Sequence, residues 1–340
     1  MVRKVTIRDV ARRAGVSVGS VSRVLNNSAH VSPELRSRVE QVVSDLGFVP
    51  NFFAQGMRGT VTHMIGIIVR DITSPLLARF VRAAQEELEV TGDVVLVACH
   101  DERRERELDL LRILTKRHVD GLIMTTSSEE DTELVRLRAS LRVPVVLYDR
   151  EIPRTCDSVR ISHKAVTRRA LDYLLDLGHR RIALVTGSPL VFPSRARLAA
   201  YDEAFEARGL AVDPRLVRAK SFSAFNSFAE ISGLLDLAER PTALLLGGID
   251  MLAEALRAIH DRGLVIPRDI SLIGAGDSAL ARLATPPMTV VSWDFADLGQ
   301  ASARLMKERL TGAAGTTPRH ITFPAELVIR GSCARPPRDA

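Results

Sequence analysis

The sequence predicts a small all-α unit at the N-terminus, followed by a larger α/β core with doubly wound parallel sheets. Two observations predict this division. In the first sixty residues, apolar side chains recur at helical spacing in three short blocks. From Met64 onward, short β-branched runs alternate with amphipathic helical blocks, which is typical of parallel strands covered on both faces. A chain of 340 residues is long enough for two or three domains of ordinary size.

The first two helices of the N-terminal unit are predicted by their end signals. The first begins at Thr6, whose hydroxyl can accept from free backbone N–H groups while Asp9 reaches back to complete a capping box. It ends at Gly15, because glycine adopts a left-handed turn without strain. Ser17 then caps a second helix that continues to about Leu25. A turn of only a few residues therefore joins the two helices.

A third helix completes the N-terminal unit. Ser32 followed by Pro33 predicts its start, because proline at the first helical position sacrifices no hydrogen bond. The helix is expected to end near Gly47. The small core of the unit is expected to form from Val10, Val16 and Val21. Together these signals predict three short helices around one apolar centre.

The core is expected to contain two sheets, because it has too many strands for one. The expected strands lie near 64–69, 94–98, 121–125, 145–147, 159–161, 181–186, 243–246, 270–274 and 288–291. The expected helices lie near 75–91, 102–117, 163–177, 194–208, 250–262 and 294–311. The last segment, 334–340, reads as a disordered tail. Two sheets facing each other account best for this pattern.

Positive charge is concentrated at the N-terminal end. Residues 1–60 contain nine Lys/Arg and four Asp/Glu, whereas the other 280 residues contain 38 and 37. A basic end on a nearly neutral body is typical of a nucleic-acid-binding unit. Charge alone would favour a solvated basic face or tail, so a sequence motif has to decide between the two interpretations.

The composition also limits the compartment and the chemistry. The sequence has no run of eighteen apolar residues, and its N-terminus is amphipathic rather than uniformly apolar, so no secretion or membrane signal is expected. Cys99, Cys156 and Cys333 are far apart and lack the spacing of a metal site. We therefore expect a protein of the reducing cytoplasm with no metal and no cofactor.

Residues 6–26 have the layout of a helix-turn-helix. Ala11 is small where the first two helices would cross, and Gly15 takes the turn between them. The second helix would then present its N-terminal end to a DNA major groove. The exposed positions at that end are Val18, Gly19, Ser22 and Arg23. This arrangement predicts sequence-specific DNA binding.

At this point the sequence closely resembles the lactose-repressor (LacI/GalR) family of bacterial regulators. The match continues through 31–33 and 50–57, and further segments of the core follow in family order at 65–69, 117–123, 177–183 and 285–290. The resemblance implies a transcriptional regulator that binds a pseudo-palindromic operator as a homodimer, and we expect it to be a repressor. It also implies a core of periplasmic-binding-protein type with a small-molecule effector in a cleft between two subdomains.

The resemblance implies a division of labour in the helix-turn-helix. Arg23 matches the base-reading arginine, whose guanidinium fits guanine O6 and N7. Val18 and Gly19 occupy the two positions that vary with operator sequence, and we expect a thymine-methyl contact from Val18. Side chains suited to phosphate contacts are Ser17, Ser20, Ser22, Asn26 and His30. The serines fit capping and helix packing about as well. The remaining expected DNA contacts are Thr6, Asn51, Ala54 and Met57.

A hinge of about 50–59 is expected to close the DNA-binding unit at residue 60. In the family this segment forms a short helix on DNA, and a leucine from each subunit wedges into a central base step. Ala54 matches the family, whereas Met57 stands where that leucine would be and remains a usable apolar wedge. Gly56 disfavours helix by roughly 1 kcal/mol relative to alanine. The hinge is therefore expected to depend on DNA for its ordering.

The resemblance also divides the core of 61–333. One subdomain is expected from about 61–161 and 292–322, and the other from about 162–291 and 323–333. Residues that match effector-binding positions of the family are Asp149, Arg197, Phe222 and Trp293. Without the resemblance, Asp149 reads more simply as a turn cap.

Other effector positions depart from the family. Gly248 and Ile249 replace a polar pair, and Gly276 replaces an acid and leaves only Asp277. Leu76 and Leu77 replace an aromatic pair. The replaced groups would normally hydrogen-bond and stack on a sugar ring. The effector can therefore still be a sugar, a sugar acid or a related metabolite, or there can be none. An acidic or less polar metabolite held by Arg197 is favoured.

Two other classes of protein compete with this interpretation. A solute-binding protein would share the core but would lack a DNA-binding unit. An enzyme is suggested by 274–277, which resembles the Gly-Ala-Gly-Asp turn of ribokinase-like sugar kinases. The match covers four residues, and the sequence has no Walker loop and no nucleophile elbow. A non-enzymatic regulator is therefore the stronger prediction.

Overall fold

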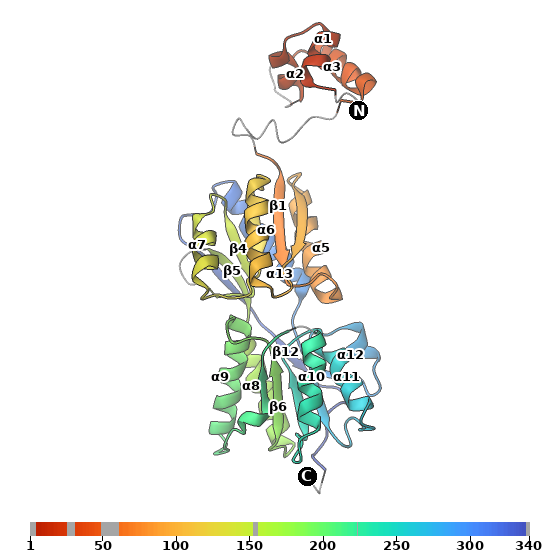
Figure 1. The fold of residues 1–340 in the computed structure, drawn as a ribbon, viewed down its shortest axis with the longest axis vertical. Coiled ribbons are helices and arrows are strands. Elements are labelled where there is room, and N and C mark those ends of the chain that lie inside the picture. Colours follow the sequence, from red (N-terminus) through yellow and green to blue (C-terminus); the bar gives the residue numbers. More distant parts are fainter. Residues whose placement is uncertain (1–4, 26–30, 49–60, 152–155, 223, 338–340) are drawn as a thin grey trace. The chain divides into compact units, whose positions relative to one another are not determined.

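The computed structural model describes residues 5–25, 31–48, 61–151, 156–222 and 224–337. It separates into two compact units, Met1–Thr62 and His63–Ala340, which are described one at a time (Figure 1). Among the described residues, no helix is both long enough and apolar enough to cross a membrane.

The N-terminal unit consists of three helices, α1 (Ile7–Ala14), α2 (Val18–Leu25) and α3 (Pro33–Leu46). Thr6 and Asp9 form the predicted capping box, and the Thr6 amide donates to Asp9 Oδ2 at 3.0 Å. Gly15 has a φ of 65°, in the left-handed region that favours glycine. The predicted helix starts and stops of this unit are confirmed. Its buried apolar side chains include Val10, Ala11, Val21, Val24 and Val39.

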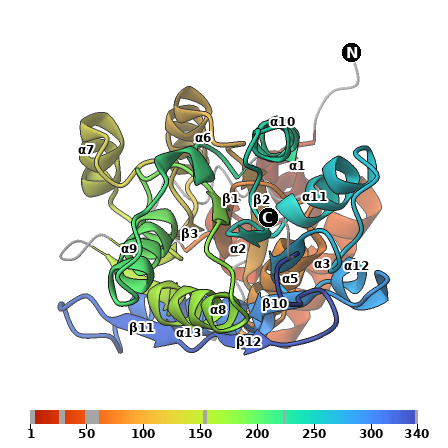
Figure 2. The same cartoon turned by 90° about the horizontal axis from the view of Figure 1, so that it is seen from below.

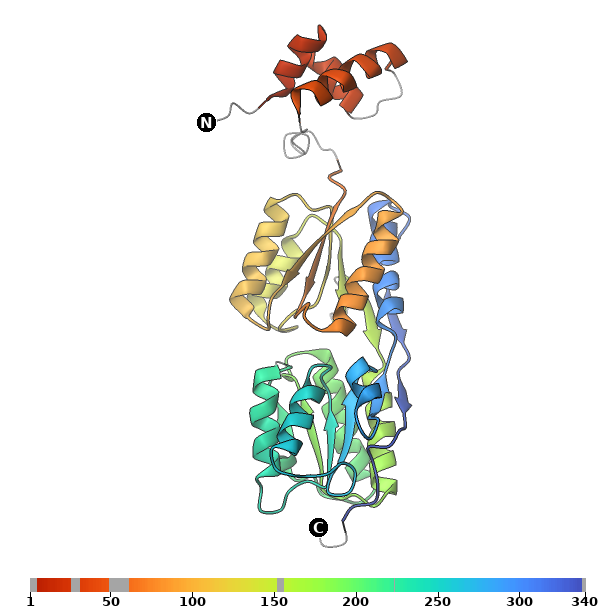
Figure 3. The same ribbon diagram turned by 90° about the vertical axis from the view of Figure 1, so that its right-hand side faces the viewer.

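The larger unit contains two six-stranded sheets (Figures 1 and 3). The first has the order β11 (His320–Phe323), β5 (Asp157–Ile161), β4 (Val145–Tyr148), β3 (Gly121–Met124), β1 (Met64–Val69), β2 (Val94–Cys99) and is parallel throughout. The second has the order β12 (Glu326–Val328), β10 (Thr289–Ser292), β9 (Ser271–Ala275), β8 (Ala243–Leu246), β6 (Ile182–Thr186), β7 (Val217–Ala219). In it only β12 is antiparallel to its neighbour. The predicted doubly wound parallel fold is confirmed.

Helices cover both faces of each sheet (Figures 2 and 3). The first sheet is flanked by α5 (Pro75–Glu89), α13 (Phe295–Leu310), α6 (Arg104–Lys116) and α7 (Thr132–Ser140). The second is flanked by α8 (His163–Asp176), α9 (Phe192–Glu206), α10 (Ala224–Leu235), α11 (Met251–His260) and the short α12 (Ala279–Leu283), with a 3₁₀ turn η1 (Pro214–Leu216). Apolar clusters fill the space on either side of each sheet, so all four faces are packed.

The sequence pattern missed several elements. The helices that it did not predict are α7, α10 and α12, and the strands are β7, β11 and β12. Each missed strand has three or four residues and lies at a sheet edge, where its side chains are half-buried or exposed. Such strands lack the continuous apolar run that reveals a central parallel strand.

The tail that was expected to be disordered from Ala334 onward makes backbone hydrogen bonds at its first residue. The backbone carbonyl of Ala334 accepts a hydrogen bond from His179 Nε2 at 2.8 Å. The Ala334 amide donates to Ser271 Oγ at 3.1 Å. His179 is itself buried, and its Nδ1 accepts from the Thr242 hydroxyl at 2.8 Å. The tail begins with backbone bonds to buried side chains, which composition alone does not reveal.

Buried histidines predict that the larger unit loses stability in acid. Burial lowers the pKa of His100 to about 3, and burial also lowers the pKa of His163 and His179. The folded protein keeps these groups neutral, whereas the unfolded chain protonates them below about pH 6.5. The contribution of these neutral histidines to the free energy of unfolding is present above pH 6.5 and is lost as the pH falls below that value. Urea unfolding should give a free energy lower at pH 5 than at pH 7, by about 2 kcal/mol from His100 alone.

The control for this prediction is His100→Gln. His100 accepts from the Glu102 amide at Nδ1 and contacts Thr125 Oγ1 at 3.0 Å through Nε2, so the variant removes the titration at one defined site. It should reduce the difference between the two pH values. An unfolding free energy that is equal at pH 5 and pH 7 in the wild type would contradict the prediction.

Candidate functional site

The N-terminal half of α2 forms an exposed surface on the helix-turn-helix. Val18 is 39% exposed, and Ser17, Gly19 and Arg23 are also exposed. The opposite face of the helix carries Val21 and Val24, which are buried. The local helical period therefore points the polar and small residues outward while the valines hold the helix on α1 and α3.

Arg23 has its guanidinium at the surface. Its Nε donates a long hydrogen bond of 3.4 Å to the Gly19 carbonyl, one turn earlier in α2. A Cβ at Gly19 would meet only Ser17 Oγ, at 3.7 Å. Packing within this unit therefore does not demand a glycine at that position. Because Gly19 has no side chain, it leaves open space on the helix surface beside Arg23.

Ser17, Ser20 and Thr6 have local partners. Ser17 Oγ accepts from the Ser20 amide at 3.1 Å and lies 3.0 Å from Ser20 Oγ, so Ser17 caps α2. Ser20 and Ser22 are half-buried. The Thr6 hydroxyl donates to Asp9 Oδ2 at 2.7 Å. Capping accounts for these contacts of Thr6, Ser17 and Ser20, and the DNA contacts of all four residues stay a prediction. The other expected DNA contacts, Asn26, His30, Asn51, Ala54 and Met57, lie outside the described residues.

The larger unit has two subdomains, each built around one of the two sheets. A small inner cavity lies between them, near the carboxyl ends of β4 and β8. Its volume is about 70 Å³. Five of the seven predicted effector residues line it, and they are Asp149, Arg197, Phe222, Ile249 and Trp293. These residues come from five different loops and helices. The fold therefore brings together side chains that are up to 144 positions apart in the sequence.

A buried chain of three polar side chains forms one wall of the inner cavity. His163 Nε2 lies 2.9 Å from both carboxylate oxygens of Asp149. Arg197 Nη2 donates to His163 Nδ1 at 3.0 Å. Because Nδ1 accepts, Nε2 carries the proton and donates it to Asp149. Asp149 thus has a specific partner, and the competing interpretation as a simple turn cap does not describe its contacts.

The charges of Asp149 and Arg197 in this hydrogen-bonded group stabilise each other. Burial alone would raise the pKa of Asp149, but the nearby His163, Arg150 and Arg197 lower it below its usual value. Burial lowers the pKa of Arg197 to about 10, which leaves it protonated at neutral pH. Burial and the neighbouring Arg197 lower the pKa of His163. The wall therefore consists of a carboxylate, a neutral imidazole and a guanidinium.

His163 was missed by the sequence interpretation. It stands at the first position of α8, where nothing in the local pattern distinguishes it from a surface residue. Its ring packs edge-on against Trp293, with centroids 5.5 Å apart. Only the return of the chain from β5 into α8 places it between Asp149 and Arg197.

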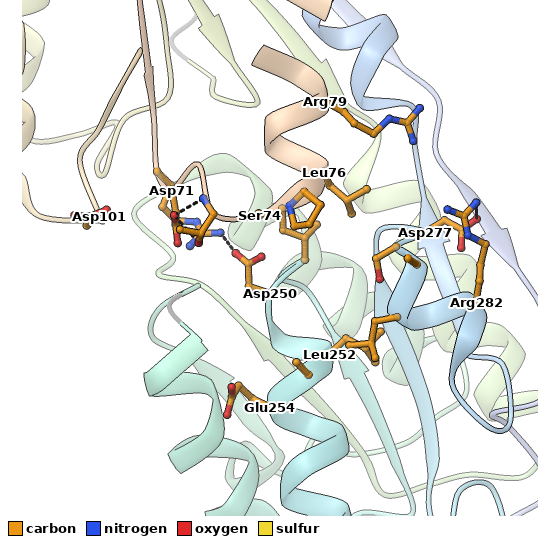
Figure 4. A pocket seen from close by; sticks show the side chains of 18 of the residues that line it. Asp71, Ser74, Leu76, Arg79, Asp101, Asp250, Leu252, Glu254, Asp277 and Arg282 are labelled. Carbon is orange, nitrogen blue, oxygen red and sulfur yellow. Dashed lines mark hydrogen bonds and ion pairs between the residues drawn. The ribbon is translucent and has the colours of Figure 1, made fainter. Parts of the chain in front are cut away.

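A wider outer cleft adjoins the inner cavity and has a volume of about 740 Å³ (Figure 4). Charged side chains of both subdomains line it, among them Asp71, Arg79, Asp250, Asp277 and Arg282. Leu76 and Asp277, the other two predicted effector residues, lie here, and Ile249 lines both spaces. An ion pair between Arg70 and Asp250 connects the subdomains across the cleft.

The departures from the family pattern fit together in space. Gly276 has a φ of 79°, and a Cβ built on it would lie 2.4 Å from Leu76 Cδ1 and 3.1 Å from Ile249 Cγ2. A side chain at position 276 would therefore require the end of the Leu76 side chain to move. The three positions form an apolar contact between the subdomains in place of polar ligand groups.

In the kinase-like turn, the Gly276 amide and the Asp277 carboxylate are already engaged. The Gly276 amide donates to the Val291 carbonyl at 2.8 Å, so it is not available to cradle an anion. Asp277 Oδ1 lies 2.8 Å from Arg330 Nη2, which makes it a poor general base. The described residues also contain no group of three or more His, Cys, Asp or Glu that could hold a metal ion.

Two glutamates of the first subdomain bind backbone and side chains of the second. Glu102 accepts from the Phe222 amide at 3.0 Å and from the Ser221 hydroxyl. Glu129 accepts from the Phe192 amide at 2.9 Å and pairs with Arg195. Neither glutamate was singled out in the sequence, because an acid in a loop carries no pattern that reveals its distant partner.

A helix-turn-helix unit and a two-subdomain α/β core with a cleft define the class of ligand-responsive transcriptional regulators. A family model of bacterial regulatory proteins of the lacI family matches residues 6–51, and one of a periplasmic binding protein-like domain matches residues 171–333. The chain is 30% identical to the HTH-type transcriptional regulator DegA of Bacillus subtilis over 332 residues, which cover 97% of this chain and 98% of that protein. The chain belongs to the lacI family of bacterial regulatory proteins.

Solved structures agree over nearly the whole chain. The lac repressor dimer bound to operator and the anti-inducer ONPF is 29% identical with a TM-score of 0.80, and the match covers 98% of this chain and 100% of that chain. The complex of the transcriptional regulator CelR with cellobiose is 30% identical with a TM-score of 0.72, and the match covers 96% of this chain and 99% of that chain. The expected family and fold are confirmed.

Proposed function

We propose that this protein is a sequence-specific transcriptional repressor that binds a pseudo-palindromic operator as a homodimer and responds to a small-molecule effector in its cleft. The observation that carries the proposal is the outward face of α2, where Val18, Gly19 and Arg23 are exposed while Val21 and Val24 anchor the helix. An exposed helix end with one arginine beside small side chains suits the major groove.

The relatives support the remaining parts of the proposal. The lac repressor structure is of a dimer on operator DNA with a bound anti-inducer, and the CelR structure holds cellobiose. We assign the effector of this chain to the inner cavity and outer cleft, with Asp149, Arg197, Phe222, Ile249 and Trp293 in the first and Leu76 and Asp277 in the second. Because its partner is DNA, the protein is assigned to the cytoplasm.

The experiment that tests the proposal is selection of bound sequences from random duplex DNA, followed by footprinting of the selected site. Two protected half-sites related by a dyad are expected, with a bound complex that contains two chains. A single unpaired half-site, or a bound monomer, would overturn the homodimer. No catalytic step is assigned to the chain, and a phosphotransfer assay with ATP and common sugars tests the kinase alternative.

Ordering of the hinge by DNA stays a prediction from the sequence. If Met57 is the minor-groove wedge, Met57→Ala should weaken operator binding and reduce the DNA bend while non-specific binding keeps its salt dependence. Met57→Leu should match or exceed the wild type. Measurements of operator affinity and bend angle for the three proteins at one salt concentration check this. An unchanged bend in Met57→Ala would contradict the wedge.

A further inference from the structure

The inner cavity contains a buried donor without a hydrogen-bond partner. Arg197 is 4% exposed, and its Nη2 is satisfied by His163, but its Nη1 has no partner among the described residues. Arg197 lines the cavity and contacts the Phe222 ring, with the guanidinium carbon 5.9 Å from the ring centroid. A charged donor that is buried and unpaired is costly, so a ligand that accepts from it would be strongly favoured.

The charges that line the cavity do not balance. Arg70 is paired with Asp250, which leaves Arg150 and Arg197 facing the single carboxylate of Asp149. Arg150 donates to the carbonyls of Thr126 and Asp149 at 2.7 and 2.8 Å rather than to an acid. Asp149 is engaged by His163 through both oxygens. The lining therefore has one excess positive charge, which an anion would neutralise.

The rest of the lining is poor in groups that recognise hydroxyls. Besides the charged residues it offers only Thr125, the Tyr148 hydroxyl and Trp293 Nε1 as polar side-chain groups, and the other side chains are apolar, among them Leu77, Phe222, Ile249 and Phe295. Gly247 and Gly248 stand beside them, and a Cβ at Gly247 would lie 2.6 Å from Thr186 Oγ1 and 2.9 Å from Arg197 Cδ. Thr186 and the arginine thus occupy the room that a side chain at 247 would need. A polyhydroxylated ring would find few acceptors here.

The size of the cavity limits the ligand. A volume of about 70 Å³ is below the 300–1,000 Å³ of ordinary ligand pockets. It would hold only a few water molecules, at roughly 10–15 Å³ for each. Without movement of the subdomains, the space therefore suits a body of a few carbon atoms rather than a hexose.

We propose that the cleft selects a compact carboxylate with an apolar body, whose carboxylate accepts from Arg197 Nη1 and whose body contacts Phe222, Ile249 and Trp293. This proposal rests on the effector role assigned to the cleft. It excludes neutral sugars as the main effector, although the cleft is built on the scaffold that holds cellobiose in CelR. The carboxylate supplies the missing negative charge, and the apolar body replaces water along the aromatic wall.

Calorimetry with the full chain tests this proposal. The probes are propanoate and 3-methylbutanoate, each paired with its neutral amide, and glucose. Each carboxylate should bind at least about tenfold more tightly than its amide, because its hydrogen bond to a guanidinium is charge-assisted. Glucose should bind more weakly than either carboxylate. Equal affinity of acid and amide, no binding of either carboxylate at millimolar concentration, or tighter binding of glucose would overturn the proposal.

Variants locate the site. Arg197→Gln should remove the preference for acid over amide, and Arg197→Lys should keep part of it because the charge remains while one planar donor pair is lost. Arg208→Gln is the matched control, since Arg208 is on the same subdomain but pairs with Asp176 at the surface. It should behave as the wild type. A preference that survives in both Arg197 variants would overturn the assignment.

Operator binding by the same proteins separates this proposal from the proposed function. If the wild type protects a palindromic site but shows no preference for carboxylates, the regulator stands and only the ligand class is wrong. If carboxylates bind but no DNA sequence is selected, the ligand class stands and the regulator is wrong.

Discussion

Replacement of Arg23 by alanine should reduce operator affinity by about 1–3 kcal/mol for each half-site that it reads. Arg23 is the exposed guanidinium of α2, and its only described hydrogen bond, to the Gly19 carbonyl, is long at 3.4 Å. The side chain can therefore turn to a guanine without breaking a strong contact. Selection from random DNA should show relaxed preference at one base pair of each half-site.

Arg38→Ala is the control for this prediction. Arg38 is exposed on α3 and its loss changes the net charge by the same amount. If Arg38 contributes only to the general electrostatic attraction of DNA, Arg38→Ala should weaken specific and non-specific binding by a similar factor. Arg23→Ala should instead lower the ratio of specific to non-specific affinity. The assignment of Arg23 is wrong if its variant keeps the selectivity of the wild type.

Replacement of Gly299 by alanine should destabilise the larger unit by about 1–3 kcal/mol, even though alanine is the better helix former. Gly299 lies in α13 where this helix packs on α5. A Cβ built there would lie 2.2 Å from the Phe80 carbonyl oxygen and 3.1 Å from the Ala84 amide nitrogen. Both atoms are backbone, so the two helices would have to move apart and open the core of the first sheet.

Gly233→Ala provides the matched comparison. Gly233 is also inside a helix, α10, but its side of the helix is exposed and a Cβ there would meet nothing within 4 Å. This variant should be more stable than the wild type, by up to about 1 kcal/mol. Urea unfolding of the three proteins measures the difference. Equal losses in both variants, or none at Gly299, would show that the close approach of α5 and α13 is not what requires the glycine.

The cleft shows how substitutions at distant positions depend on one another. Position 276 can lack a side chain because Leu76 fills the space from α5 of the other subdomain, and Ile249 closes the contact from the loop after β8. The sequence revealed each departure from the family separately. Their common cause is a contact between residues that are 200 positions apart, so no local pattern could have joined them.

The sequence by itself determined the features that depend on neighbours along the chain. The capping box of Thr6 and Asp9, the turn at Gly15 and the helix start at Ser32 are hydrogen bonds and backbone angles set within a few residues. The central parallel strands were equally legible, because burial on both faces requires a continuous apolar run.

Only the tertiary structure decided which side chains meet in the cleft. His163 lies between Asp149 and Arg197 because β4, α8 and α9 converge there, and its own neighbours in the sequence give no sign of this role. The pairing of the edge strands β11 and β12 and the hydrogen bond between Ala334 and His179 were likewise decided only by the tertiary structure. The physical reason is that the partners are supplied by chain segments far apart in the sequence. Their contact therefore depends on how the whole chain packs rather than on any local preference.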